Sequence, residues 1–227
     1  MSTLYIVGTP IGNREDLMFR ALRVLSEVDL ILCEDTRVTK KLLDYYEIKA
    51  PTLSYHHHSK LQKIDYIINL LKQGKNLALV SDAGTPGISD PGNKLINKIT
   101  ETGSLQVKII PIPGPSAVTA AASISGFPME KFLFLGFPPT KRKRKKFFEK
   151  IIDSKYPVIF YESPYRIIKT LKELSSFFIG ERRVVVCREL TKKFETVYRG
   201  KIEEVIGEIE KGKVKGEFVV VVNANSR

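Results

Sequence analysis

The chain has 227 residues, of which 43% are hydrophobic and 27% are charged, so its length allows one large domain or two small ones. No stretch approaches the roughly 20 apolar residues that a membrane span requires, and the N-terminus lacks the pattern of a secretory signal. Two cysteines and three histidines are too few for a dedicated zinc site, so no metal centre is predicted. Both cysteines, Cys33 and Cys187, lie in apolar runs, which predicts buried, reduced thiols and a cytoplasmic protein.

The net charge of +12 is carried mainly by the second half of the chain. Residues 1–113 contain 14 Lys and Arg against 12 Asp and Glu, whereas residues 114–227 contain 23 against 13. An excess of positive charge confined to one half predicts a polyanionic partner, and nucleic acid is the first candidate. An anionic membrane surface is the second candidate, but no amphipathic basic helix supports it.

Short apolar runs alternate with helical patterns through the first half. Strands are expected at residues 4–7, 30–33, 52–55, 77–80 and 107–110, and helical stripes at 17–28, 42–46 and 61–71. Asn13 and Thr36 are candidate helix caps. This alternation predicts a mainly parallel sheet, in which ligands bind beyond the carboxyl ends of the strands. The loops that begin at Gly8, Glu34, Ser81 and Pro113 are therefore candidate ligand loops.

Three prolines and a glycine at Pro111–Pro115 break this pattern, because neither a helix nor a strand continues easily through them. We therefore predict an α/β protein with a parallel-sheet domain at 1–113 and a basic, mixed-sheet domain at 114–227. Further strands are expected near 132–135, 158–161, 184–187, 196–198 and 218–222, and helices near 147–152, 167–177 and 202–209. The short connection between the strands near Cys187 and Tyr198 predicts antiparallel pairing.

A glycine-rich loop, Ser81–Gly92, directly follows one of the predicted strands. It contains three glycines, two prolines and two aspartates. Glycine lets the backbone approach a ligand closely, and proline holds a loop in shape, so a functional loop is favoured over an ordinary long turn. The chain has neither the phosphate-loop motif nor the dinucleotide fingerprint. The loop pattern by itself therefore assigns no ligand.

Seven segments, in order along nearly the whole chain, resemble signature segments of the tetrapyrrole methylase family. They are 7–13 (VGTPIGN), 33–37 (CEDTR), 81–92 (SDAGTPGISDPG), 113–117 (PGPSA), 134–138 (FLGFP), 161–164 (YESP) and 188–192 (RELTK). Within the family they are similar to the branch that methylates small-subunit ribosomal RNA. Members of that branch often carry a further C-terminal segment, whereas this sequence ends shortly after the strand expected at 218–222.

The resemblance implies two α/β domains with S-adenosylmethionine in the cleft between them, and a homodimer. It also implies 2′-O-methylation of a cytidine ribose in small-subunit (16S) ribosomal RNA. Carried over by position, the cofactor contacts are Pro10, Ser81, Asp82, Gly84, Thr85, Ser116, Ala117, Tyr161 and Leu190. Backbone groups left bare by glycine, a carboxylate and small side chains suit the amino-acid, ribose and adenine parts of that cofactor.

A ribose 2′-hydroxyl is a poor nucleophile until its proton is removed or strongly polarised. Glu34 or Asp35 is a candidate base, and Arg37 is a candidate for binding a phosphate or stabilising negative charge. The alternative is an ordinary helix start with Thr36 as its cap, and one residue can serve both purposes. Base catalysis or phosphate contact by a residue of His56–His58 is a further hypothesis, although a solvated loop is favoured there.

An unbroken basic run lies between two prolines and two phenylalanines. It consists of Lys141, Arg142, Lys143, Arg144, Lys145 and Lys146. Charge runs are commonly solvated surface, but anchoring at both ends favours contact with the RNA backbone, which provides affinity and not sequence choice.

Two alternatives remain open. A methylase of a small tetrapyrrole-like molecule is disfavoured, because a compact substrate needs no extended basic surface. A non-catalytic RNA-binding module is disfavoured, because such a module needs no glycine-rich cofactor loop beyond a strand.

Overall fold

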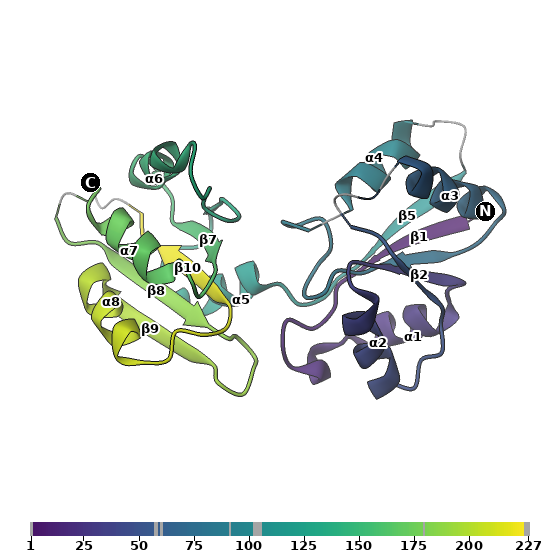
Figure 1. Cartoon of the computed structure of the whole chain (residues 1–227), viewed down its shortest axis with the longest axis horizontal. Helices are drawn as coiled ribbons and strands as arrows, with labels where there is room; N and C mark the ends of the chain where they lie inside the picture. The colour runs from purple at the N-terminus through teal and green to yellow at the C-terminus, as the bar shows by residue number, and fades with distance from the viewer. Residues whose placement is uncertain are drawn as a thin grey trace. The chain divides into compact units, whose positions relative to one another are not determined.

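The computed structural model describes residues 2–56, 59, 61–90, 92–101, 106–178 and 180–224. The chain forms two compact units, Met1–Ser116 and Ala117–Arg227, and each is built around its own five-stranded sheet (Figure 1). The hypotheses for His57 and His58 fall outside the described residues, as does Pro91 of the glycine-rich loop.

The sheet of the first unit is parallel throughout its described pairings, as the alternating pattern predicts. Its strand order is β3-β2-β4-β1-β5, and the strands are β1 (Ser2–Val7), β2 (Leu30–Cys33), β3 (Thr52–Ser54), β4 (Leu77–Leu79) and β5 (Val107–Ile112). The expected end of β5 at residue 110 is wrong, because the strand includes Pro111 and Ile112. A proline is tolerated there because β5 is an edge strand, where one N–H is not needed for a ladder.

Helices cover both faces of this sheet (Figure 1). They are α1 (Phe19–Glu27), α2 (Thr36–Tyr45), α3 (Leu61–Lys72) and α4 (Asn93–Glu101). Successive strand side chains point to opposite faces. Leu4 and Ile6 pack with α3 and α4, whereas Val7 packs with α1 and α2. Each face of the sheet therefore has its own apolar core.

The two predicted helix caps of this unit differ from the structure. Asn13 caps the short 3-10 helix η1 (Arg14–Asp16), and α1 begins only at Phe19. Asp35, not Thr36, caps α2, because its extended backbone places its carboxylate to accept the Arg37 N–H at 2.8 Å. An anionic acceptor at this position also interacts favourably with the helix dipole.

The sheet of the second unit is mixed. Its order is β6-β7-β10-β8-β9, with β6 (Leu133–Phe134), β7 (Val158–Glu162), β8 (Arg183–Arg188), β9 (Thr196–Lys201) and β10 (Phe218–Val222). β6 pairs in parallel with β7, and the other described pairings are antiparallel. The predicted antiparallel pairing near Cys187 and Tyr198 is confirmed by β8 and β9.

Three helices, α6 (Arg144–Ile152), α7 (Ile167–Ser175) and α8 (Ile202–Lys211), share one apolar core with alternate residues of β7, β8 and β10. Phe147 and Phe148 anchor α6 in this core, since both are buried and their rings meet edge to face at 5.9 Å. Helix α5 (Ala117–Ser125) lies against β7 and β10.

Candidate active site

The candidate ligand loops of the first unit follow the carboxyl ends of β1, β2, β4 and β5, at one edge of the parallel sheet. The loops after β1 and β4 are joined by an antiparallel bridge. The Thr9 N–H donates to the Gly84 carbonyl at 2.9 Å, and the Gly84 N–H donates to the Thr9 carbonyl at 3.1 Å. The buried Thr9 hydroxyl lies 3.2 Å from the Ser81 carbonyl oxygen and 3.3 Å from that of Gly84. Pro10, also buried, directly follows this bridge.

Ser81 and Gly84 shape the turn that opens the glycine-rich loop. The Ser81 hydroxyl is buried and lies 3.2 Å from the Ala83 carbonyl oxygen and 3.3 Å from that of Gly84. Gly84 has a φ of +82°, a left-handed conformation that favours glycine. These two predicted contacts are therefore held in a defined turn.

The loop after β5 makes main-chain contact with the loop after β1. The Gly8 N–H donates to the Ile112 carbonyl at 3.1 Å, and a Cβ on Gly8 would lie 2.8 Å from the Gly114 Cα. The Thr85 hydroxyl donates to the Pro115 carbonyl at 3.2 Å, which links the glycine-rich loop to the same segment. Three of the four candidate loops are thus fastened together.

The fourth loop joins through Asp82. Its Oδ1 accepts the Asp35 N–H at 3.0 Å. The Asp35 carboxylate in turn accepts a pair of hydrogen bonds from the Arg37 guanidinium, with Nη2 to Oδ2 at 2.7 Å and Nε to Oδ1 at 3.1 Å. These hydrogen bonds lower the pKa of Asp35 to about 2. The structure therefore brings the predicted catalytic and cofactor residues of this unit to one edge.

Asp90 is a group that the sequence reasoning did not single out. Burial, together with the nearby charges of Glu34 and Asp82, raises its pKa to about 7. Burial also raises the pKa of Asp82. The available signal was the second Ser-Asp pair of the glycine-rich loop, Ser89-Asp90, which repeats Ser81-Asp82.

A small cavity lies behind this edge. It has a volume of about 20 Å³ and is lined by Thr9, Ser81 and Asp82 together with Val80 and side chains of α1 and α2. This volume holds about one water molecule, so a nucleoside would have to lie on the exposed side of the loops.

The predicted cofactor contacts divide between the two units. Pro10, Ser81, Asp82, Gly84, Thr85 and Ser116 belong to the first unit, and Ala117, Tyr161 and Leu190 belong to the second. Ser116 is the last residue of its unit and Ala117 is the first residue of α5, and both are half-buried.

In the second unit Tyr161 belongs to an aromatic cluster formed by two of the signature segments. Its ring lies 5.0 Å from that of Phe134 and 5.4 Å from that of Phe137, and its N–H donates to the Gly136 carbonyl at 2.9 Å. Phe137 is 52% exposed, so the cluster keeps an open aromatic surface.

Leu190 lies between two residues with a left-handed backbone, Glu189 at φ 53° and Thr191 at φ 66°. Such conformations are costly for residues with a Cβ and persist where contacts enforce them. The Glu189 carboxylate accepts from the Lys192 ammonium at 2.9 Å and from the Glu217 N–H at 3.0 Å. Backbone strain of this kind concentrates at functional segments.

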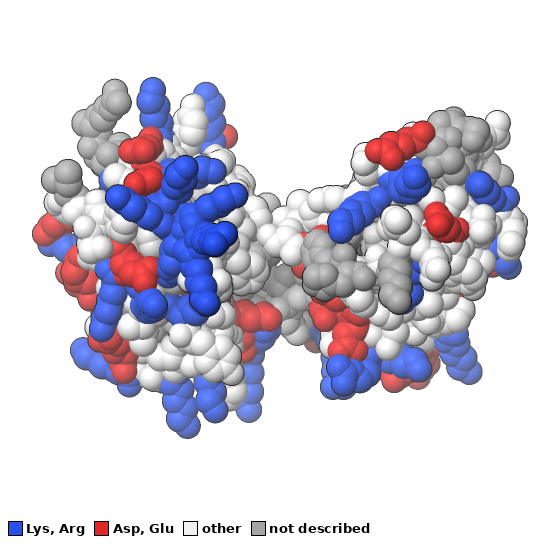
Figure 2. Space-filling view, turned by 45° about the horizontal axis from the view of Figure 1, so that its top comes forward, with Lys and Arg blue, Asp and Glu red and all other residues white. Residues whose placement is uncertain are grey.

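The basic run lies at the start of α6, and Figure 2 shows Lys and Arg side chains gathered on this face of the second unit. Five of its six residues are exposed, namely Lys141, Arg142, Lys143, Lys145 and Lys146. The Arg144 side chain is only 12% exposed.

Among the described residues, no group of His, Cys, Asp and Glu could hold a metal ion. In the same part of the chain, no helix combines the length and the apolar character needed to cross a membrane.

Comparison with known proteins identifies the family. Residues 3–206 match the family described as Tetrapyrrole (Corrin/Porphyrin) Methylases. A relative from Thermotoga maritima named ribosomal RNA small subunit methyltransferase I is 46% identical over 223 residues, which cover 98% of this chain and 99% of the relative. A relative of the same name from Bacillus subtilis is 45% identical over 227 residues, which cover 100% of this chain and 76% of the relative.

Solved structures agree on the fold. A diphthine synthase superposes with a TM-score of 0.74 at 13% identity and covers 98% of this chain and 90% of its own. The cobalt precorrin-4 methyltransferase CbiF gives 0.71 at 17% identity, with 97% and 94% covered. The chain therefore belongs to the tetrapyrrole methylase family, in the branch whose members are named ribosomal RNA small subunit methyltransferase I.

Proposed function

We propose that this protein transfers a methyl group from S-adenosylmethionine to the 2′-hydroxyl of a cytidine ribose in small-subunit (16S) ribosomal RNA. The family fixes the coarser statement, that the protein is an S-adenosylmethionine-dependent methyltransferase. The observation that carries the choice of RNA is the exposed basic run at the start of α6, since a compact tetrapyrrole would not need it.

The residues of the first unit fit the cofactor. Gly8 and Gly114 let the main chains after β1 and β5 approach each other, and Gly84 takes the left-handed turn that pairs with Thr9, so the loops that would hold the cofactor are fixed in position. When bound, S-adenosylmethionine supplies a methyl group on a cationic sulfonium, which requires positioning more than activation. The carboxylates of Glu34, Asp82 and Asp90 give this edge a negative field that suits a cationic ligand.

The acceptor hydroxyl requires a base with a pKa near the operating pH. Asp35 is a weak base, because the Arg37 guanidinium lowers its pKa to about 2. Asp90, with a pKa of about 7, is better suited to take the proton. We assign Asp35 the role of orienting Arg37, whose side chain is 86% exposed and is available for a phosphate.

The exposed cations of the basic run would bind phosphates of the RNA backbone. Contacts of this kind provide affinity and orientation, whereas the choice of nucleotide depends on groups that contact bases. From the resemblance to the tetrapyrrole methylase family we also infer that the protein acts in the cytoplasm as a homodimer.

Two measurements test the proposal. Calorimetry with S-adenosylmethionine should show binding to the purified chain. Mapping of 2′-O-methylated positions in 16S ribosomal RNA should show one cytidine that loses its methyl group in cells without this protein and regains it on incubation with purified protein. Full methylation in such cells, or transfer to a small tetrapyrrole and not to RNA, would contradict it.

A further inference from the structure

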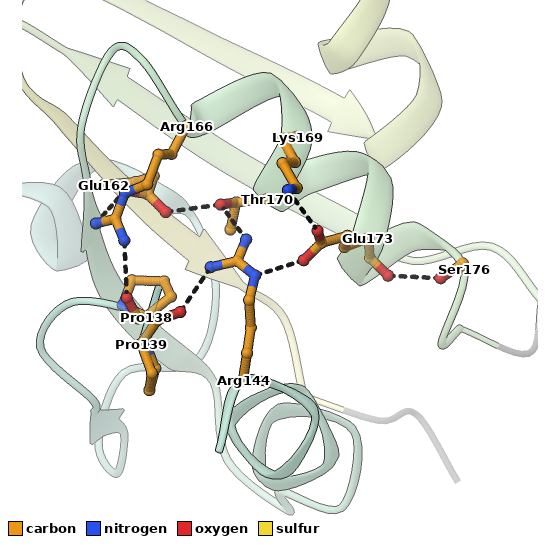
Figure 3. Close-up of polar contacts among 9 residues, drawn as sticks. All are labelled: Pro138, Pro139, Arg144, Glu162, Arg166, Lys169, Thr170, Glu173 and Ser176. Atoms are coloured by element: carbon orange, nitrogen blue, oxygen red, sulfur yellow. Dashed lines mark hydrogen bonds and ion pairs between the residues drawn. The ribbon is translucent and has the colours of Figure 1, made fainter. Parts of the chain in front are cut away.

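One member of the basic run is held differently from its neighbours. The Arg144 guanidinium donates through Nε to Glu173 Oε2, through Nη1 to the Pro139 carbonyl at 3.0 Å and through Nη2 to the Thr170 hydroxyl at 2.7 Å (Figure 3). It also lies over the Phe148 ring, 5.1 Å from its centroid. Each of its three nitrogens therefore donates to a partner within the second unit.

A second guanidinium completes the arrangement. Arg166 Nη1 donates to the Pro138 carbonyl at 3.0 Å, and its Nη2 pairs with Glu162 Oε1 at 2.8 Å. The Glu162 side chain is 0% exposed, and its Oε2 accepts the Thr170 hydroxyl at 2.6 Å. Figure 3 shows these contacts as one continuous network in which Arg144 and Arg166 each bind the carbonyl of one proline.

Pro138 and Pro139 can be held through their backbone only by hydrogen bonds to their carbonyl groups, because proline has no N–H to donate. The residues that follow form a short loop, Thr140–Lys143, before α6 begins at Arg144. Since Arg144 is the first helical residue and its side chain binds Pro139, it fastens both ends of this loop at once. The loop carries Lys141, Arg142 and Lys143.

The backbone of Lys143 supports this view. Lys143 is the N-cap of α6 with a φ of 66°, and no side-chain hydrogen bond caps the helix there. A left-handed backbone is disfavoured for a residue with a Cβ and persists where surrounding contacts enforce it. The contacts of Arg144, on the adjacent residue, are suited to enforce it.

We propose that Arg144 is a positioning residue that holds the Thr140–Lys143 loop ready for RNA and does not itself bind phosphate. The inference rests on the proposed function, because it assumes that the exposed cations of the run contact RNA. Ordering the loop before binding lowers the entropy cost of association. The acidic Glu173 would then promote RNA binding, although its charge alone would oppose it.

Removing the negative charge of Glu173 should therefore weaken RNA binding, whereas charge repulsion alone predicts that it strengthens it. The affinity for 16S ribosomal RNA transcribed in vitro tests which effect holds. Glu173→Gln should weaken binding by about 3- to 10-fold, because Arg144 loses a charged partner. Glu149→Gln is the matched control, since Glu149 is an acid of α6 that pairs with the exposed Lys145, at 3.9 Å, and forms no ion pair or hydrogen bond with Arg144 among the described residues. It should bind equally well or slightly better. Equal or tighter binding by Glu173→Gln would overturn the proposal.

Arg144→Lys keeps the charge but loses the planar fork, so it should weaken binding to a similar extent with an unchanged slope of affinity against salt. Arg144→Gln should leave the slope unchanged as well. A slope reduced by about 0.9 in Arg144→Gln but kept in Arg144→Lys would instead identify Arg144 as a phosphate contact. Thr170→Val should weaken binding and Thr170→Ser should restore it, and this pair decides the matter if Glu173→Gln does not fold.

Kinetic constants, cofactor affinity and Tm distinguish a failure of the role assigned to Arg144 from a failure of the proposed RNA interface. The KM for RNA should rise in Glu173→Gln, while kcat and the affinity for S-adenosylmethionine stay constant; a general loss of structure would lower both affinities and Tm together. If Lys141→Gln and Lys145→Gln also leave RNA binding unchanged, it is the proposed basic interface that fails.

Discussion

Gly8 and Gly114 approach so closely that a Cβ on either would clash with the main chain of the other. A Cβ on Gly8 would lie 2.8 Å from the Gly114 Cα, and a Cβ on Gly114 would lie 2.8 Å from the Gly8 oxygen. Neither neighbour is a flexible side chain that could turn aside. The loops after β1 and β5 are therefore kept in register by the absence of two side chains.

We expect Gly8→Ala to destabilise the protein by about 1–3 kcal/mol, which is typical of overpacking. Differential scanning calorimetry would detect this as a fall in Tm of about 2–4 °C for each kcal/mol. Binding of S-adenosylmethionine should also weaken, because the loops separate. Gly207→Ala is the control: Gly207 lies in α8 with nothing within 4 Å of a Cβ, so this change should leave stability equal or higher. Equal stability of Gly8→Ala and the natural chain would contradict the close approach.

Asp82→Ala should weaken the binding of S-adenosylmethionine by about 10- to 100-fold, the range expected for loss of a hydrogen bond to a charged group. The change also removes the acceptor of the Asp35 N–H. Asp82→Asn keeps an acceptor oxygen and should bind the cofactor with intermediate affinity. Isothermal titration calorimetry on the three proteins would measure the order, and equal affinities would exclude Asp82 from the cofactor site.

The raised pKa of Asp90, about 7 against an ordinary 3.8, has a defined consequence for stability. The folded state binds the Asp90 proton more tightly than the unfolded state, so this contribution to stability is full below pH 4 and is lost as pH rises towards 7. Asp90→Asn removes this loss. The difference in Tm between Asp90→Asn and the natural chain should therefore favour the variant more at pH 8 than at pH 4.5. The same difference in Tm at both pH values would contradict the raised pKa.

The same group gives a kinetic prediction. If Asp90 takes the proton of the ribose hydroxyl, the rate of methyl transfer should rise through pH 7 in the natural chain and stay low at every pH in Asp90→Asn. Single-turnover assays under saturating RNA and cofactor would show this. An unchanged pH profile in the variant would leave Glu34 as the base.

Charge removal in the basic run should affect RNA and not the cofactor. Lys141→Gln, Lys145→Gln and Lys143→Asn should each lower the slope of log affinity against log salt by up to about 0.9. Asparagine is chosen at Lys143 because it tolerates the left-handed backbone there. Lys72→Gln, at an exposed position on α3, removes the same charge from the other unit and should change the slope least. Loss of cofactor affinity in these variants would contradict the separation of the two roles.

The fold was predictable from the sequence where the physics is local. Apolar runs of about strand length predict the buried parallel strands, because neither face of such a strand meets water. Helix α4 was not predicted, since only Leu95 and Ile99 are buried on its short length. The cap of α2 was misassigned to Thr36 because Asp35 and Thr36 are both good caps, and the hydrogen bond from Asp35 to Asp82, 47 residues away, is not visible in the sequence.

The candidate site shows the same limit. Pattern alone treats the six cations of the basic run as equivalent. Arg144 differs from the others because its side chain binds Thr170 and Glu173, which lie 26 and 29 residues further along the chain. The burial that raises the pKa of Asp90, and the nearness of its carboxyl to Glu34, 56 residues earlier, likewise depend on the folded loop.

The bridge between Thr9 and Gly84 couples the loop after β1 to the loop after β4. β1 and β4 run in parallel, yet beyond their ends these residues pair in the antiparallel sense, so each loop turns back on the other. A ligand that orders either loop must order its partner, and a fluctuation that opens one must break the hydrogen bonds of both. Slow hydrogen exchange at the Thr9 and Gly84 amides should therefore be gained or lost together.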